Sequence, residues 1–121
     1  MPSTTTYKRG QVVVVTVPFT DQMGSKRRPA VVVSSQAFHR GLPDVIVCPI
    51  SSQPRYFERP GRGDHPLVRW SRVGLRYPST VRISNIVAVE KRIISRVLGT
   101  LEARDLLRVE NGLRQAFGLA D

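Results

Sequence analysis

The segment GSKRRP at positions 24–29 places a cation at the start of an apolar run. Pro29 restricts the backbone of Arg28 to an extended conformation, so the Arg28 side chain leaves the chain in a defined direction. A guanidinium binds phosphate through paired hydrogen bonds. The segment therefore indicates a phosphate contact by Arg28, although three consecutive cations are also typical of a solvated loop.

A second segment, CPISSQ at positions 48–53, places two hydroxyls and an amide directly after an apolar run. Hydroxyls at the end of a strand commonly bond the neighbouring backbone. Ser51, Ser52 and Gln53 are therefore either strand-terminating residues or polar contacts for a ligand. Cys48 is the single cysteine of the chain and lies within the apolar run. We interpret it as an inert, buried thiol.

Catalytic-cysteine and metal chemistry have little support in this composition. The two histidines, His39 and His65, are isolated along the chain and show no pairing motif with Cys48. A zinc site needs about four Cys, His or carboxylate ligands in regular spacings, and such spacings do not occur here. We therefore expect no metal and no cofactor.

The charge of the chain is large and unevenly distributed. The 121 residues include 19 Lys and Arg against 9 Asp and Glu, a net charge of +10. Basic residues outnumber acidic ones by six to two in residues 1–52 and by seven to two in residues 53–82, but only by six to five in residues 83–121. This excess, mostly arginine, favours nucleic acid as a partner over anionic lipid, because no basic amphipathic helix is visible.

The elements that must position these side chains are β-branched apolar runs separated by turn-forming segments. Residues 11–18, 30–34, 44–50, 67–73 and 79–89 are predicted strands, which gives five or six short strands in all. Residues 19–28 and 51–63 are predicted loops, rich in Gly, Pro and charge. Both chemical segments therefore lie where a predicted strand meets a predicted loop.

The last part of the sequence predicts one amphipathic helix. Thr100 is placed to cap it, Glu102 lies in its first turn, and apolar residues recur at helical spacing as far as Phe117. Gly112 inside it costs about 1 kcal/mol relative to Ala, so packing has to hold the helix in place. We predict a mainly β domain with a C-terminal α-helix, a compact barrel over residues 9–121 preceded by a flexible tail over residues 1–8.

Length and hydropathy favour a single domain outside the membrane. A chain of this length buries roughly two thirds of its unfolded surface. The longest apolar run, residues 12–19, is far shorter than the ~20 residues that cross a bilayer. No signal-peptide cleavage site follows it, so we expect a cytoplasmic protein with no membrane partner.

Five blocks of the sequence, in this order, resemble the MazF/PemK (Kid-like) toxins of toxin–antitoxin systems. They are GQVVVV at 10–15 with PFTD at 18–21, RPAVVVS at 28–34, VCPISS at 47–52, VRISNI at 81–86, and the helix from position 101. The RPAVVVS block after a glycine-containing loop is the most specific. The resemblance covers nearly the whole chain after the first eight residues.

The resemblance implies an SH3-like β-barrel, the MazF/PemK/CcdB-like toxin fold, assembled as a homodimer. It implies a metal-independent, sequence-specific endoribonuclease that cleaves single-stranded RNA to 2′,3′-cyclic phosphate and 5′-hydroxyl ends and so inhibits translation and growth. The expected target is mRNA, with tRNA and rRNA as alternatives, and the expected partner is a cognate acidic antitoxin. A gyrase-poisoning toxin and a non-catalytic RNA-binding barrel are alternative functions on the same fold.

By the same resemblance, three residues match catalytic positions of the family: Arg28 before the proline, Ser51 in place of a threonine whose hydroxyl contacts the scissile phosphate, and Arg82. Because the pKa of arginine lies above ~12, we expect both arginines to stabilise the phosphorane rather than to act as bases. Ser84 stands where the family commonly has an acidic residue, so no general base is identified. Further RNA contacts are expected from Thr20, Lys26, Arg27, Ser52, Gln53, Arg55 and Ser84.

Overall fold

The computed structural model describes residues 6–18 and 25–119 of the chain. Within them it contains seven strands, three α-helices and three single-turn 3-10 helices. In chain order the elements are β1 (Gln11–Pro18), β2 (Ser25–Val32), α1 (Gln36–His39), β3 (Asp44–Ser51), α2 (Pro54–Glu58), β4 (Asp64–Pro66), η1 (Trp70–Val73), β5 (Thr80–Arg82), η2 (Ile83–Asn85), β6 (Val87–Glu90), η3 (Lys91–Ile93), β7 (Ile94–Thr100) and α3 (Ala103–Phe117).

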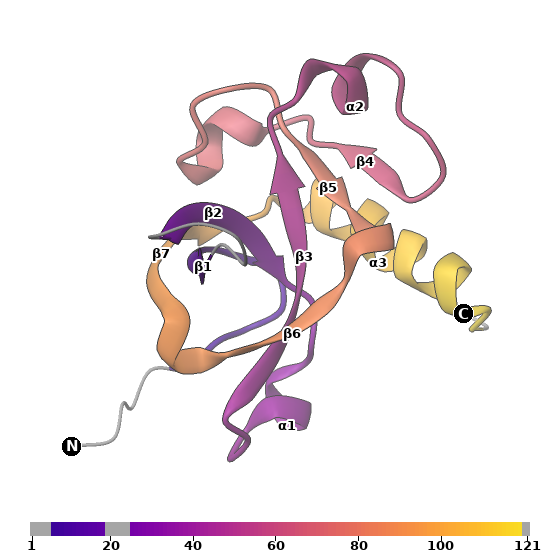
Figure 1. The fold of residues 1–121 in the computed structure, drawn as a ribbon. Helices are drawn as coiled ribbons and strands as arrows, with labels where there is room; N and C mark the ends of the chain where they lie inside the picture. Colours follow the sequence, from indigo (N-terminus) through magenta and orange to yellow (C-terminus); the bar gives the residue numbers. More distant parts are fainter. Residues whose placement is uncertain (1–5, 19–24, 120–121) are drawn as a thin grey trace.

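β3 is the central strand of one antiparallel sheet with the order β4-β5-β3-β2-β1-β7, and β6 also pairs with β3. Strands β1, β2, β3, β6 and β7 curl around a common interior (Figure 1). Among the described residues no pairing joins β6 to β7, so the barrel is not closed there. The predicted fold class, mainly β with a C-terminal helix, is confirmed.

Successive side chains along the central strands point to opposite faces of the sheet, and both faces are buried. Val12, Val31 and Cys48 belong to one cluster of buried residues, together with Val109 of α3. Their strand neighbours, such as Val13, belong to a second cluster inside the curl of the sheet. Because both faces of β1, of β3 and of residues 30–32 of β2 are buried, these parts read as continuous apolar runs in the sequence.

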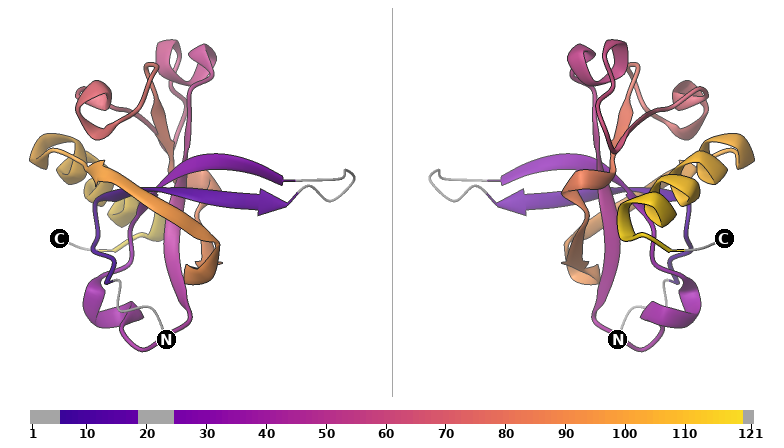
Figure 2. Two further views of the ribbon diagram at one scale, coloured as in Figure 1. Left: turned by 90° about the vertical axis from the view of Figure 1, so that its left-hand side faces the viewer. Right: turned by 90° about the vertical axis from the view of Figure 1, so that its right-hand side faces the viewer.

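Helix α3 packs on the face of the sheet that carries the first of these clusters (Figures 1 and 2). The Asp105 carboxylate, only 2% exposed, accepts hydrogen bonds from the backbone N–H groups of Val68 and Arg69, both at 2.9 Å. These bonds attach the segment after β4 to the helix. The expected cap is wrong, because Thr100 ends β7, and α3 begins at Ala103 with Glu102 in the N-cap position.

The strand predictions are accurate for β1 and β3, right in part for β2, β5 and β6, and wrong for residues 67–73. β2 begins at Ser25, so Arg28 lies within a strand and not in a loop. The predicted strand 67–73 is instead an irregular segment followed by η1. The predicted strand 79–89 is broken by η2 into two short strands. β7 was not predicted, because charged and polar residues interrupt its apolar pattern.

The segment before β1 is attached to the barrel by a buried histidine. The Ser34 hydroxyl donates to His39 Nδ1 at 2.7 Å, and His39 Nε2 donates to the Tyr7 carbonyl at 2.6 Å. Tyr7 is 8% exposed. Residues 1–5 of the expected tail lie outside the described residues. None of the helices described is long and apolar enough to cross a membrane.

Candidate functional site

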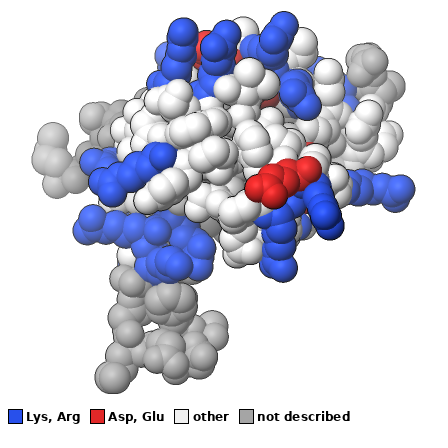
Figure 3. All heavy atoms as spheres, turned by 90° about the horizontal axis from the view of Figure 1, so that it is seen from above, with Lys and Arg blue, Asp and Glu red and all other residues white. Residues whose placement is uncertain are grey.

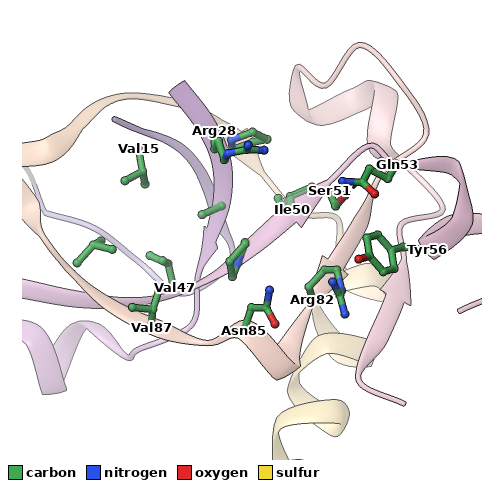
Figure 4. A pocket seen from close by; sticks show the side chains of 14 residues that line it. Val15, Arg28, Val47, Ile50, Ser51, Gln53, Tyr56, Arg82, Asn85 and Val87 are labelled. Carbon is green, nitrogen blue, oxygen red and sulfur yellow. Dashed lines mark hydrogen bonds between the residues drawn. The ribbon is translucent and has the colours of Figure 1, made fainter. Parts of the chain in front are cut away.

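A pocket of about 430 Å³ opens where β2, β3 and β5 meet. Arg28, Ser51 and Arg82, the three residues singled out in the sequence, all line it (Figure 4). Polar side chains, with Arg82 and Ser51 among them, gather at one end, and valines such as Val47 line the other. The complete lining is Val15, Arg28, Pro29, Ala30, Val47, Pro49, Ile50, Ser51, Gln53, Tyr56, Arg82, Asn85, Val87 and Val89.

Strand pairing determines how these residues come together. Ala30 pairs with Pro49 between β2 and β3, and Ser51 pairs with Thr80 between β3 and β5. Arg28 and Arg82 each lie two residues from one of these pairs, on strands that flank β3. Residues that are 54 positions apart in the sequence therefore meet at one end of the central strand.

The Arg82 side chain is held by an ion pair and an aromatic ring. Its Nε donates to Asp64 Oδ1 at 2.8 Å, and its Cζ lies 3.8 Å from the centre of the Tyr56 ring. Asp64 Oδ2 accepts from the Gly61 backbone N–H at 2.9 Å. The Asp64 and Arg82 side chains are 6% and 20% exposed, so this ion pair is shielded from water on most sides. Arg55 donates to the Tyr56 hydroxyl at 2.8 Å.

Ser51 ends β3 with its hydroxyl directed into the pocket region. Its Oγ accepts from the Gln53 backbone N–H at 3.2 Å. This is the strand-terminating bond that the sequence allowed as one alternative. Because the oxygen accepts in this bond, the hydroxyl proton is still available to donate to a ligand. The two interpretations of Ser51 are therefore compatible.

Arg28 is exposed and faces two cavities at once. The second is a groove of about 780 Å³ that shares Arg28 and Pro29 with the pocket. Its lining contains four arginines and no Asp or Glu among the described residues. The lining residues are Val14, Arg27, Arg28, Pro29, Ser52, Gly74, Leu75, Arg76, Tyr77, Ser79, Ser95, Arg96 and Leu98. We refer to it below as the arginine groove.

The remaining residues expected to contact RNA are spread around this site. Gln53 lines the pocket, and Arg27 and Ser52 line the arginine groove. Lys26, Arg55 and Ser84 are exposed and line neither cavity, and Thr20 lies outside the described residues.

Sequence reasoning did not identify Asp64, Asn85, Arg76 or Arg96 as site residues. For Asp64 the usable signal is the register of the β4–β5 pair, which sets it directly opposite Arg82. That register is not visible in a single sequence, because β4 is only three residues long.

The cysteine and the histidines lie away from both cavities. Cys48 is fully buried, as predicted, and burial raises the pKa of its thiol to about 12. Burial, and next the charge of Arg108, lower the pKa of His65. His39 is 1% exposed within its hydrogen-bonded network. The lining of the pocket includes no Asp, Glu or His among the described residues.

Seen from the α2 end, Lys and Arg side chains are spread around the molecule and few acidic groups interrupt them (Figure 3). Of the four ion pairs among the described residues, only Asp64–Arg82 lies at the pocket. Arg27, Arg28, Arg76 and Arg96 take part in none of them. The cationic surface around the site is therefore available to an anionic ligand.

Comparison with protein families gives one match. The model of the family described as "PemK-like, MazF-like toxin of type II toxin-antitoxin system" matches residues 8–117. A search of curated protein sequences gives no match.

The fold is similar to several solved structures of toxins. A MazE–MazF structure from Deinococcus radiodurans superimposes with a TM-score of 0.76 at 19% identity, covering 96% of this chain and 99% of that chain. An endoribonuclease in complex with its cognate antitoxin from a mycobacterial species gives a TM-score of 0.71 at 21% identity, covering 96% and 97%. Mycobacterium tuberculosis toxin MazF-mt6 gives 0.69 at 21% identity, covering 90% and 99%.

Proposed function

The chain belongs to the family of PemK-like, MazF-like toxins of type II toxin–antitoxin systems, and we propose that it is a metal-independent endoribonuclease that cleaves single-stranded RNA in the cytoplasm. The observation that carries the proposal is the pocket in which Arg28, Ser51 and Arg82 meet. Two guanidinium groups and one hydroxyl in a partly enclosed site match the needs of a phosphodiester whose charge increases during reaction.

The proposed reaction is an internal transesterification. The ribose 2′-oxygen attacks the neighbouring phosphorus, the bond from phosphorus to the 5′-oxygen breaks, and a 2′,3′-cyclic phosphate and a 5′-hydroxyl remain. Arg28 and Arg82 stabilise the added negative charge of the phosphorane, and the Ser51 hydroxyl donates to one of its oxygens. Because the described lining contains no carboxylate or imidazole, the 2′-proton passes to water, from a hydroxyl whose pKa the guanidinium groups lower, and water supplies the proton that the leaving 5′-oxygen takes up.

The shared position of Arg28 gives a path for the RNA strand. We place the scissile phosphate between Arg28 and Ser51 in the pocket, and the flanking nucleotides in the arginine groove. Arg76 and Arg96 contact phosphates there, and the ring of Tyr77, which is 64% exposed, offers a face on which a base can stack. Sequence preference then comes from the loops around these cavities.

The test is cleavage of a defined mixture of single-stranded RNAs in excess EDTA, with cut sites mapped and their ends identified. We expect cuts at a short sequence motif, with cyclic phosphate and 5′-hydroxyl ends. The Arg28→Ala variant serves as the control for a contaminating nuclease. Cleavage that depends strictly on Mg²⁺, or 5′-phosphate ends, would contradict the proposed chemistry.

The same preparation separates the alternative functions. A gyrase-poisoning toxin leaves RNA intact and inhibits purified gyrase, and a non-catalytic RNA-binding barrel shifts the mobility of RNA without cutting it. Neither alternative needs both arginines and Ser51 in one pocket, so the structure favours the nuclease. mRNA is the proposed target, and tRNA and rRNA enter the assay as competing substrates.

We propose a homodimer and a cognate acidic antitoxin as the protein partners. An acidic segment that folds onto the arginine groove would compete with RNA for the same cations. RNA binding should weaken faster with salt than antitoxin binding, because neutralised phosphates release counterions whereas an antitoxin also buries apolar side chains. Titration of both affinities against salt tests this, and RNA cleavage that continues with antitoxin bound would show separate sites.

A further inference from the structure

The position two residues after Arg82 is Ser84, which cannot supply a carboxylate to the site, yet Arg82 does have a carboxylate partner. It comes from the facing strand, because Asp64 of β4 pairs directly with Arg82 of β5. We propose that Asp64 is a positioning residue that holds the Arg82 guanidinium toward the scissile phosphate, with the Tyr56 ring as a second support. The proposal rests on the proposed nuclease function.

The hydrogen bonds of Asp64 determine its orientation. Its Oδ1 accepts from Arg82 Nε at 2.8 Å and its Oδ2 accepts from the Gly61 N–H at 2.9 Å. Because both oxygens are engaged and the side chain is 6% exposed, the carboxylate cannot rotate freely. Asp64 does not line the pocket, so it does not reach the substrate itself.

The same contacts restrict Arg82. Its Nε is engaged by Asp64, and its guanidinium lies over the Tyr56 ring at 3.8 Å. The Nη atoms of Arg82 donate no hydrogen bond among the described residues, so these donors are left for an oxyanion in the pocket. A guanidinium held in this way loses less side-chain entropy when it binds a phosphate than a free one does.

The test is a double-mutant cycle on RNA cleavage with Asp64→Asn, Asp64→Ala and Arg82→Ala. We expect each Asp64 variant to lower kcat about 10- to 100-fold with KM changed less than threefold, because positioning matters most in the transition state. The Asn variant keeps the volume of the side chain, but it brings an amide N–H₂ against the Gly61 N–H if its oxygen faces Arg82. In the Arg82→Ala background, Asp64→Asn should lower kcat less than twofold.

The matched control is Glu110→Ala, which removes an ion pair with Arg9 of 3.3 Å that lies away from both cavities. It should leave kcat unchanged. A kcat close to the original value in folded Asp64→Asn protein would overturn the proposal. It would also be overturned if Asp64→Asn lowered kcat by the same factor in the original protein and in the Arg82→Ala background.

A measurement on the unaltered protein does not depend on whether a variant folds. We expect the Arg82 Nε proton to exchange with solvent at least tenfold more slowly by NMR than that of exposed Arg59. Equal exchange rates would overturn the proposal. If the unaltered protein cleaves no RNA, the proposed function fails, whereas active protein with insensitive Asp64 variants shows that only this assignment is wrong.

Discussion

Gly112 on α3 lies against His65 on β4 so closely that no Cβ fits between them. An ideal Cβ on Gly112 would overlap the imidazole Nε2 of His65 and lie 2.6 Å from Cδ1 of Ile83. Ile83 is 2% exposed and packs in the core beneath the helix. The glycine therefore allows α3 to lie close to the sheet. The packing gained by this close approach outweighs the low helix propensity of glycine.

We predict that Gly112→Ala destabilises the protein by up to about 2 kcal/mol. Alanine gains about 1 kcal/mol of helix propensity, but the overlap costs about 1–3 kcal/mol, and buried Ile83 has little room to move. Urea unfolding followed by circular dichroism measures the change. Gln115→Ala on the exposed side of the same helix is the control, with an effect below about 0.5 kcal/mol. Stabilisation by Gly112→Ala would show that the helix shifts at little cost.

Arg28→Ala should lower the rate of RNA cleavage about 100-fold or more while the melting temperature stays within the range of surface variants. The reason is that Arg28 is exposed and packs into no core, so its removal affects the ligand and not the fold. Arg104→Ala, an exposed cation of α3 outside both cavities, is the matched control. Near-normal cleavage by folded Arg28→Ala protein would remove Arg28 from the mechanism.

Ser51→Ala should lower kcat strongly, and Ser51→Thr should preserve or raise it. Threonine supplies the same hydroxyl on a stiffer side chain and suits the end of a strand. Single-turnover cleavage of one RNA substrate measures the rate of the chemical step in each variant. Equal rates for the Ala and Thr variants would mean that the hydroxyl serves only the Gln53 backbone bond.

Arg76→Ala and Arg96→Ala should each weaken binding of a long RNA about 3- to 10-fold and leave cleavage of a minimal dinucleotide unchanged. Both side chains line the arginine groove and not the pocket, so they reach only nucleotides that flank the cut. The slope of log Kd against log salt should fall by about one for each arginine removed. A change in oligomeric state in these variants, seen by light scattering, would indicate that the groove is a subunit contact instead.

The Cys48 thiol should make the protein less stable at high pH. Its pKa is raised to about 12 in the folded state, whereas an unfolded thiol ionises near pH ~8.5. Stability is therefore unaffected below the unfolded pKa and falls as the pH rises toward the folded one. Between pH 8 and 10.5 the native protein should lose about 2.5 kcal/mol more than Cys48→Ala. Urea midpoints at the two pH values measure this, and parallel losses would contradict it.

The sequence was sufficient for the parts of the fold that depend on continuous apolar runs. β1 and β3 are buried on both faces, so their limits could be predicted to within one residue. β4 and β5 have three residues each and exist because they pair with each other and with β3, which no local pattern encodes. β7 mixes polar, charged and apolar residues without a regular alternation, and its strand character comes from pairing with β1 at the edge of the sheet.

The candidate site divides in the same way. Arg28, Ser51 and Arg82 were found because they match family positions next to apolar runs, and the pocket brings all three together. Asp64 and the arginine groove were not found, because they depend on register and on the course of the chain between β4 and β5. The sequence gives Asp64 no special role, and its role depends on its position opposite Arg82 in the folded sheet.

The three pairings of β3 have a consequence for changing the RNA sequence that the proposed nuclease recognises. Arg28, Ser51 and Arg82 are carried on β3 and its direct partners, whereas residues 52–79 leave the end of β3 and return to it as a single excursion. We expect that this excursion can be exchanged with that of a relative while Arg28, Ser51 and Arg82 stay in place on the sheet. Tyr56 and Asp64, which hold Arg82, have to be kept, and so do Leu67 and Val73, which are buried in the core. A chimera that keeps them should cut RNA at a new motif at an undiminished rate.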